Sequence, residues 1–137
     1  MWGKIKITPE DKLFSEYIRR RAIQRVHGCE KCKAPLFDVQ KDNGTVLPAW
    51  RLLECSHFHG RRKQSVRYHE DNAAGLCFTC HQHLGENPHE HDEWFKERLG
   101  ERRFELLNIQ AQQVVKPDVA AIRLYLKALL ARLKEEV

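Results

Sequence analysis

The chain has 137 residues, with 24 Lys and Arg against 19 Asp and Glu, so its formal net charge is +5. This length suits one domain, and 42% hydrophobic with 31% charged residues exclude a membrane protein and a disordered acidic chain. The basic excess favours a polyanionic partner. No stretch offers the ~20 apolar residues of a membrane span. No apolar segment follows the charges of residues 1–6, so we expect no secretory signal and a cytoplasmic location.

The first predicted helix covers residues 8–28. Thr8 is its expected cap, Pro9 suits its first turn, and Asp11 completes a capping box. Gly28 is expected to end it. Apolar residues recur at helical spacing along one face. The arginines on the remaining surface are Arg19, Arg20, Arg21 and Arg25. This surface is either a solvated helix face or a contact for phosphates.

Short strands are predicted in the next part of the chain. Residues 29–52 are irregular, with short strands expected at 46–47 and 52–53 around Pro48. Residues 53–59 alternate as in a strand, and residues 65–68 are expected to form its returning partner. The side chains expected on one face of the first strand are Cys55, His57 and His59.

Four helices are predicted after residue 76. The first opens around Cys80 and is broken by Gly85 and Pro88, and the next two cover residues 90–99 and 101–115. The last begins at Pro117-Asp118 and runs to the C-terminus with a wide apolar stripe, which must be buried. Either it packs on its own domain or it binds a partner, including a second copy of the chain.

Two C-x-x-C pairs are the strongest chemical signal, Cys29 with Cys32 and Cys77 with Cys80. Two such pairs complete a tetrahedral four-thiolate site, which prefers zinc. Their separation is too long for a zinc ribbon and suits a treble clef, in which a loop, a β-hairpin and a helix N-terminus carry the ligands in turn. Buried or redox-active cysteines are the alternative. Cys55 is expected to be a core residue or else a fifth ligand.

Histidines gather between His57 and His91, close to these cysteines. His57 and His59 precede the second pair, Asn72 leads into it, and His81 follows it directly. An imidazole beside a hydrated divalent ion suits phosphodiester hydrolysis, because the ion polarises the phosphate while the neutral imidazole takes a proton from water. Each histidine taken alone fits a surface residue or a satisfied hydrogen-bonder better than a site, but the joint pattern indicates a site. Further candidate ligands are His83, His89 and His91.

This order of motifs resembles the HNH, or ββα-metal, endonucleases that carry a four-cysteine zinc site. The segments Ser56-His57-Phe58, residues 67–72 and residues 76–81 are most similar to the NinG or Rap family of phage recombination endonucleases. The likeness covers roughly residues 10–110. It implies an α+β fold with a treble-clef, ββα-metal core flanked by N-terminal and C-terminal helices. We expect a single domain over residues 1–137, whose successive parts are 8–28, 29–85, 86–116 and 117–137.

The resemblance also implies roles for the site residues. His57 is expected to be the general base, Asn72 to hold the His-bearing strand, and His81 to bind the catalytic ion, which is Mg²⁺ or Mn²⁺ in the cell. His59 is similar to the second histidine of the His-x-His in phage endonuclease VII and is a second candidate ligand. Ser56 stands where many HNH enzymes have a metal-binding Asp, so His59, another histidine or an acid completes the site, or the ion binds weakly. The acids considered are Glu54 and Asp71. Ligation rich in imidazole would also accept Zn²⁺ or Ni²⁺ in crystals.

The expected substrate is branched or nicked DNA, and the expected setting is phage or prophage recombination in a bacterial host. Basic residues between the two halves of the site are expected to contact phosphates, or else form a solvated loop. They are Arg61, Arg62, Lys63 and Arg67. A homodimer through the C-terminal helix is expected as a possible assembly. The alternatives are a non-catalytic treble-clef zinc protein that binds DNA or RNA, and a scaffold that uses the last helix.

Overall fold

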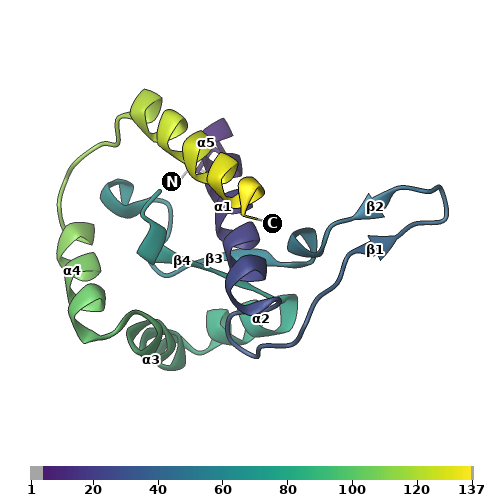
Figure 1. Ribbon diagram of the computed structural model, residues 1–137. Helices are drawn as coiled ribbons and strands as arrows, with labels where there is room; N and C mark the ends of the chain where they lie inside the picture. Colours follow the sequence, from purple (N-terminus) through teal and green to yellow (C-terminus); the bar gives the residue numbers. More distant parts are fainter. Residues whose placement is uncertain (1–4, 137) are drawn as a thin grey trace.

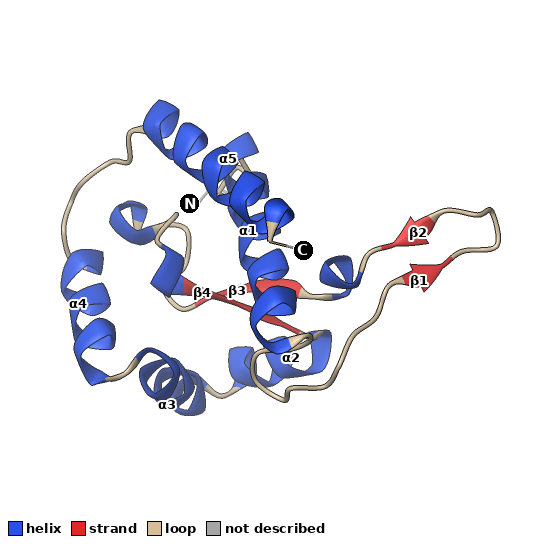
Figure 2. Ribbon diagram, viewed as in Figure 1, coloured by secondary structure: helices blue, strands red, loops and turns tan. Residues whose placement is uncertain are grey.

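The computed structural model describes residues 5–136 (Figure 1). Residues 1–4 and residue 137 lie outside this range. The expectation that the N-terminal segment holds no secretory signal therefore concerns residues that are in part outside the described structure. The described part contains five helices and two small antiparallel sheets (Figure 2). The elements are α1 (Pro9–Val26), β1 (Val39–Gln40), β2 (Val46–Leu47), β3 (Glu54–His57), β4 (Ala73–Leu76), α2 (Phe78–Glu86), α3 (Pro88–Leu99), α4 (Glu101–Ala111) and α5 (Val119–Glu135). The expected mixture of helices and strands is confirmed.

Helix α1 begins as predicted. The Asp11 amide donates to Thr8 Oγ1 (3.1 Å), and the Thr8 amide donates to an Asp11 carboxylate oxygen (2.9 Å), so the capping box is complete. Its end differs from the expectation, because His27 rather than Gly28 takes the left-handed conformation (φ 58°). Gly28 is required for a different reason: a Cβ there would lie 1.9 Å from the Ala34 carbonyl oxygen.

Helix α1 lies at the centre of the molecule, between α5 and the hairpin of β3 and β4 (Figure 1). Phe14 and Ile18 of α1 form a buried cluster with Leu126 and Leu130 of α5. The apolar stripe of the last helix therefore packs on its own chain, which was one of the two alternatives. Asp118 caps this helix through a hydrogen bond from the Ala121 amide (3.1 Å).

Strand β3 pairs with β4, so that Cys55 lies opposite Gly75 and His57 opposite Ala73. The predicted returning strand at residues 65–68 is wrong, since its first part is a 3₁₀ turn over Gln64–Val66. The segment of small residues at 73–76 forms the strand because α1 packs closely on it: a Cβ at Gly75 would lie 2.7 Å from the Ala22 Cβ. Tertiary packing outweighs weak strand propensity here.

The strand predicted at residues 52–53 is also wrong, since Leu52 ends the 3₁₀ turn Ala49–Leu52. From β4 the chain continues through α2, α3 and α4, which surround the hairpin on its other side (Figure 1). Buried apolar side chains join these helices to the hairpin. They include Leu76, Leu84, Phe95, Leu99, Phe104 and Leu107. The two-stranded sheet of β1 and β2 extends away from the helices and from the other sheet (Figure 1). Among residues 5–136, no helix has the length and apolarity needed to cross a membrane.

Candidate metal centre and histidine cleft

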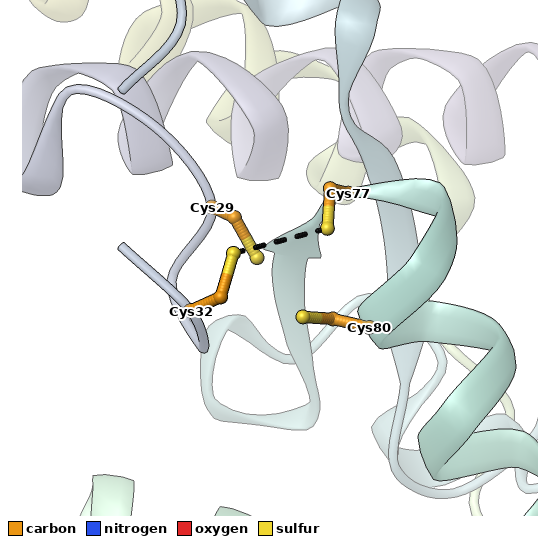
Figure 3. A group of neighbouring side chains, drawn as sticks. All are labelled: Cys29, Cys32, Cys77 and Cys80. Carbon is orange, nitrogen blue, oxygen red and sulfur yellow. Dashed lines mark hydrogen bonds between the residues drawn. The ribbon is translucent and has the colours of Figure 1, made fainter. Parts of the chain in front are cut away.

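The four paired cysteines come together between a loop and a helix (Figure 3). Cys29 follows the end of α1, and a tight turn brings back Cys32, with the Lys33 amide donating to the Cys29 carbonyl (2.9 Å). Cys77 is the N-cap residue of α2, which places Cys80 in the first helical turn. All four sulfur atoms lie within 4.8 Å of one another. The prediction that the two pairs form one cluster is confirmed.

The cluster fits a structural zinc ion. Four thiolates at about 2.3 Å from zinc place their sulfurs about 3.8 Å apart, and the Sγ atoms of Cys32 and Cys77 lie 3.9 Å apart. Burial raises the pKa of the Cys80 thiol, and the neighbouring Cys77 and Cys29 raise it further. Burial also raises the pKa of Cys77. Four ionised thiols at this distance require a cation between them, and a closed four-thiolate set is typical of zinc.

Glu30, inside the first pair, attaches the cysteine loop to the rest of the fold. Its amide donates to the Gly75 carbonyl (3.0 Å), and its carboxylate accepts from the Gly75 amide (2.6 Å). The other carboxylate oxygen lies 2.8 Å from the Arg98 guanidinium of α3. Glu30 is buried, so these charge-assisted bonds fix the loop on β4 and α3. This role was not predicted from the sequence, although an acidic residue inside a C-x-x-C pair is a signal for it.

A second feature is a cleft of about 580 Å³ into which His57 and His81 both face. His57 ends β3, and His81 lies in the first turn of α2. The remaining lining residues come mainly from α1 and the loop after β3: Ile7, Asp11, Lys12, Ser15, Arg19, Cys55 and Arg61. The cleft therefore combines two imidazoles with three side chains that carry positive charge, an arrangement suited to an anionic ligand.

Burial controls the ionisation of the groups at the base of this cleft. The His57 ring lies 5.8 Å from the Phe14 ring, and burial together with the charge of Arg61 lowers the pKa of His57 to about 4. His57 is therefore a neutral imidazole at pH 7. Burial raises the pKa of Cys55 to about 12, so this thiol remains protonated. Cys55 lies outside the four-cysteine cluster, as expected of a core residue.

Asn72 fixes the turn that follows His57. The side chain is fully buried and accepts a hydrogen bond from the His59 amide (2.8 Å) while donating to the His59 carbonyl (2.9 Å). The Asn72 carbonyl also accepts from the Phe58 amide (2.8 Å). These three bonds fix Phe58 and His59, the two residues that directly follow His57 in the chain.

His81 and Glu54 form a pair at the edge of the cleft, with His81 Nδ1 2.6 Å from Glu54 Oε1. Asp71, the other acid considered, is instead bonded to Arg103 of α4. His59 does not share a face with Cys55 and His57, because β3 ends at His57 and the chain turns away. Its Nε2 atom lies 2.8 Å from Asn108 Oδ1 on α4.

The four predicted DNA contacts separate into two groups. Arg61 lines the cleft, and Arg62 and Lys63 are exposed on the loop beside it. Arg67 is buried, and its guanidinium donates to both carboxylate oxygens of Asp11 (3.0 and 2.6 Å). We therefore assign Arg67 to the support of the fold and not to the predicted phosphate contact.

The three remaining histidines lie on α2 and α3. His83 Nε2 is 2.7 Å from a Glu90 oxygen, and His89 Nε2 is 3.1 Å from a Glu93 oxygen. His91 packs with its ring 5.3 Å from that of Phe58. None of these three histidines lines the cleft.

Helix α4 supports the loop between β3 and β4. This support was not predicted from the sequence. Besides the contact between Asn108 and His59, Ser65 Oγ donates to the Gln110 carbonyl (2.6 Å), and Gln110 Nε2 donates to the Ser65 carbonyl (3.1 Å). With the pair of Asp71 and Arg103, these bonds attach the loop at three points along its length.

Comparisons of the chain with family models, with curated proteins and with solved structures give no match. The chemistry available to the site therefore follows from its own geometry. A buried neutral imidazole, a half-exposed pair of imidazole and carboxylate, and three cations converge on one cleft beside a four-thiolate centre. This arrangement can hold a phosphate and accept a proton next to it.

Proposed function

We propose that the chain is a zinc-stabilised DNA endonuclease of the HNH, or ββα-metal, type. The observation that carries the proposal is the cleft in which His57 and His81 face Lys12, Arg19 and Arg61. A neutral base and several cations in one open cleft suit the hydrolysis of a phosphodiester, since the substrate is anionic and its attacking water must lose a proton. The proposed substrate is DNA and the proposed reaction is strand cutting.

The order of the surrounding elements supports a treble-clef core. The loop with the first cysteine pair is followed by the small β1–β2 sheet and the 3₁₀ turn Ala49–Leu52, then by the antiparallel pair β3 and β4, and then by α2 with the second pair. His57 lies on the hairpin and His81 on the helix. The cysteine cluster brings the N-terminus of α2 to the loop of the first pair, and His81 in the first turn of α2 thereby lies in the same cleft as His57.

We propose the edge of the cleft as the place of a catalytic divalent ion. His81 Nδ1 and Glu54 Oε1 are hydrogen-bonded to each other at 2.6 Å, and on binding an ion they would separate to offer one nitrogen and one oxygen ligand, a donor set suited to Mn²⁺ or Zn²⁺ and, through its carboxylate, to Mg²⁺. When bound, a divalent ion polarises the phosphate and stabilises the leaving oxygen. Ser56 is buried and a serine hydroxyl is a poor metal ligand, so we propose that Glu54 supplies the acid that many HNH enzymes carry directly before the base.

In this proposal the residues of the cleft have separate roles in the reaction. His57 takes a proton from the attacking water, and Asn72 keeps the turn after His57 in place through its two bonds to His59. Lys12, Arg19 and Arg61 neutralise the phosphates on each side of the scissile bond. These cations contact the backbone, which carries no base information. We therefore propose selectivity for DNA structure, with branched or nicked recombination intermediates of a phage as substrates.

A nicking assay with His57→Ala tests this function. Purified protein is mixed with branched and plain duplex DNA in Mg²⁺ or Mn²⁺, against EDTA. We expect metal-dependent cutting by the wild type and a loss of about 10²-fold or more in His57→Ala, with DNA binding retained. His89→Ala is the matched control, since His89 is exposed on α3 and contacts Glu93.

Two results would contradict the proposal. Full cutting by His57→Ala would remove His57 from the reaction. Binding of DNA without cutting in any metal would indicate the non-catalytic zinc protein instead. Purification under conditions that retain zinc is needed in each case, because loss of the structural ion would change the fold itself.

A further inference from the structure

Three guanidinium groups surround the side chain of Trp50. The 3₁₀ turn Ala49–Leu52 carries Trp50 and Arg51, and it packs against α1, which supplies Arg19 and Arg20. The guanidinium carbons lie 4.8 Å (Arg19), 4.7 Å (Arg20) and 5.3 Å (Arg51) from the centre of the indole ring. Each distance is within the range of a cation–π contact. Three like charges therefore converge on one ring.

This concentration of charge is only partly neutralised. Arg20 Nε lies 2.9 Å from a Glu16 oxygen, and the same oxygen lies 4.0 Å from Lys134 Nζ. Arg19 donates to the Ser15 carbonyl (3.1 Å). Within residues 5–136, neither Arg19 nor Arg51 has a carboxylate within ion-pair distance. The excess positive charge at this point of the surface attracts an anion.

The geometry favours a phosphate over a nucleobase. Trp50 is half-buried and the arginines already lie over its ring, so the indole supports the guanidiniums and leaves little face for stacking a base. Planar guanidinium groups match the oxygens of a phosphate and donate two hydrogen bonds at once. An indole that restrains several of them reduces the entropy lost when a phosphate binds.

Arg19 connects this cluster to the histidine cleft. The same side chain lies over Trp50 and lines the cleft that contains His57. We infer that Arg20 and Arg51, held by Trp50 together with Arg19, form a second subsite that binds the next backbone phosphate beyond those in the cleft, with Arg19 shared between the two. The inference rests on the proposed function, and it names DNA backbone beyond the bond that is cut as the ligand of this surface.

Salt-dependent DNA binding tests the subsite. Dissociation constants for a duplex oligonucleotide are measured at several salt concentrations in a His57→Ala background, so that the DNA stays intact. The logarithm of the association constant falls linearly with the logarithm of the salt concentration. Loss of one phosphate contact makes this slope shallower by about 1, which weakens binding about tenfold at 0.1 M salt. We expect this change in Arg51→Gln. We expect a smaller loss in Arg51→Lys, which keeps the charge and lacks the planar fork.

Arg102→Gln is the matched control. Arg102 is exposed on α4, so this variant makes the same change in net charge away from the cleft. We expect it to leave the slope unchanged. Equal affinities and equal slopes in Arg51→Gln and Arg102→Gln would overturn the subsite. Trp50→Leu provides an independent variant, and its binding should weaken as in Arg51→Gln if the ring holds the arginines.

Cutting by the protein with His57 intact, measured in parallel, separates the two proposals. If that protein cuts DNA and Arg51→Gln binds like the control, the subsite is wrong and the nuclease stands. If Arg51→Gln lowers the slope and no metal supports cutting, the arginine cluster binds a DNA phosphate in a non-catalytic protein, and the nuclease is wrong together with the position assigned to the subsite beside a scissile bond. If the chain binds no DNA at any salt concentration, both are wrong.

Discussion

The cysteine cluster and the histidine cleft both adjoin the β3–β4 pair, but they are built in different ways. The cysteine cluster lies beyond the end of β4 at Leu76, and its four ligands come from two short motifs. The cleft takes its lining from α1, β3, the following loop and α2. A centre made of two local motifs needs only a metal ion between its four thiols to hold it together. A cleft made of distant segments depends on every contact that positions those segments.

Removing one thiol from the cluster should have the largest effect. Cys77→Ser leaves three thiolates, and we expect loss of bound zinc and a loss of about 5 kcal/mol or more in the free energy of unfolding, because metal binding and folding are coupled in such centres. Metal analysis and urea unfolding measure the two quantities.

Cys55→Ala is the control for this change, since Cys55 lies outside the cluster and packs beside α1. It should keep one zinc ion per chain. A Cys77→Ser protein that retains zinc and unfolds at the wild-type urea concentration would show that the four thiols do not form one centre.

The Asp11–Arg67 pair should have the next largest effect, and it tests how α1 supports the cleft. The side chains of both residues are only 7% exposed, and removing one partner of a buried pair leaves the other charge uncompensated. We expect Arg67→Gln to lower the free energy of unfolding by about 3 kcal/mol. The matched change Arg61→Gln should leave stability nearly unchanged and weaken DNA binding. The opposite outcome would return Arg67 to the phosphate contacts.

The same pair predicts a dependence of stability on pH. Burial raises the pKa of Asp11, but the hydrogen bonds from Arg67 and Thr8 outweigh it, so the pKa lies below its ordinary value of 3.8. A carboxyl group with a lowered folded pKa stabilises the fold above its unfolded pKa, and this contribution is lost as the pH falls through the folded pKa. Urea midpoints of the wild type should therefore decline below about pH 4, and Asp11→Asn should show a flatter decline. Parallel declines would contradict the assigned ionisation of Asp11.

The contact between Asn108 and His59 should have the smallest effect. Asn108→Ala removes one partially buried hydrogen bond, which contributes about 1 kcal/mol to stability. If α4 positions the loop after His57, the rate of cutting should fall severalfold while the dissociation constant for DNA stays the same. Gln112→Ala, an exposed change just after α4, is the control. Wild-type rates in both variants would show that α4 supports the loop without affecting the cleft.

Short-range patterns predicted their parts of the fold well. The capping box of Thr8 and Asp11 and the helix that opens at the second cysteine pair depend on neighbours within a few residues, and both are present. The close approach of Gly75 to Ala22 joins segments far apart in the sequence, so the pattern of small residues at 73–76 did not identify β4. His59 was misplaced for a similar reason, since strand alternation was extended past the point where β3 ends.

The cysteine spacing, the N-terminal cap of α1 and the apolar stripes could be predicted along the chain, because they arise from contacts within one turn or one motif. The division of the arginines could not. Arg61 faces the histidines, Arg67 is buried against Asp11, 56 residues away, and Arg19 joins the cleft to Trp50. These identical side chains have different roles only because α1 packs on the hairpin. Burial and the nearest opposite charge, not residue type, determine what a guanidinium group binds.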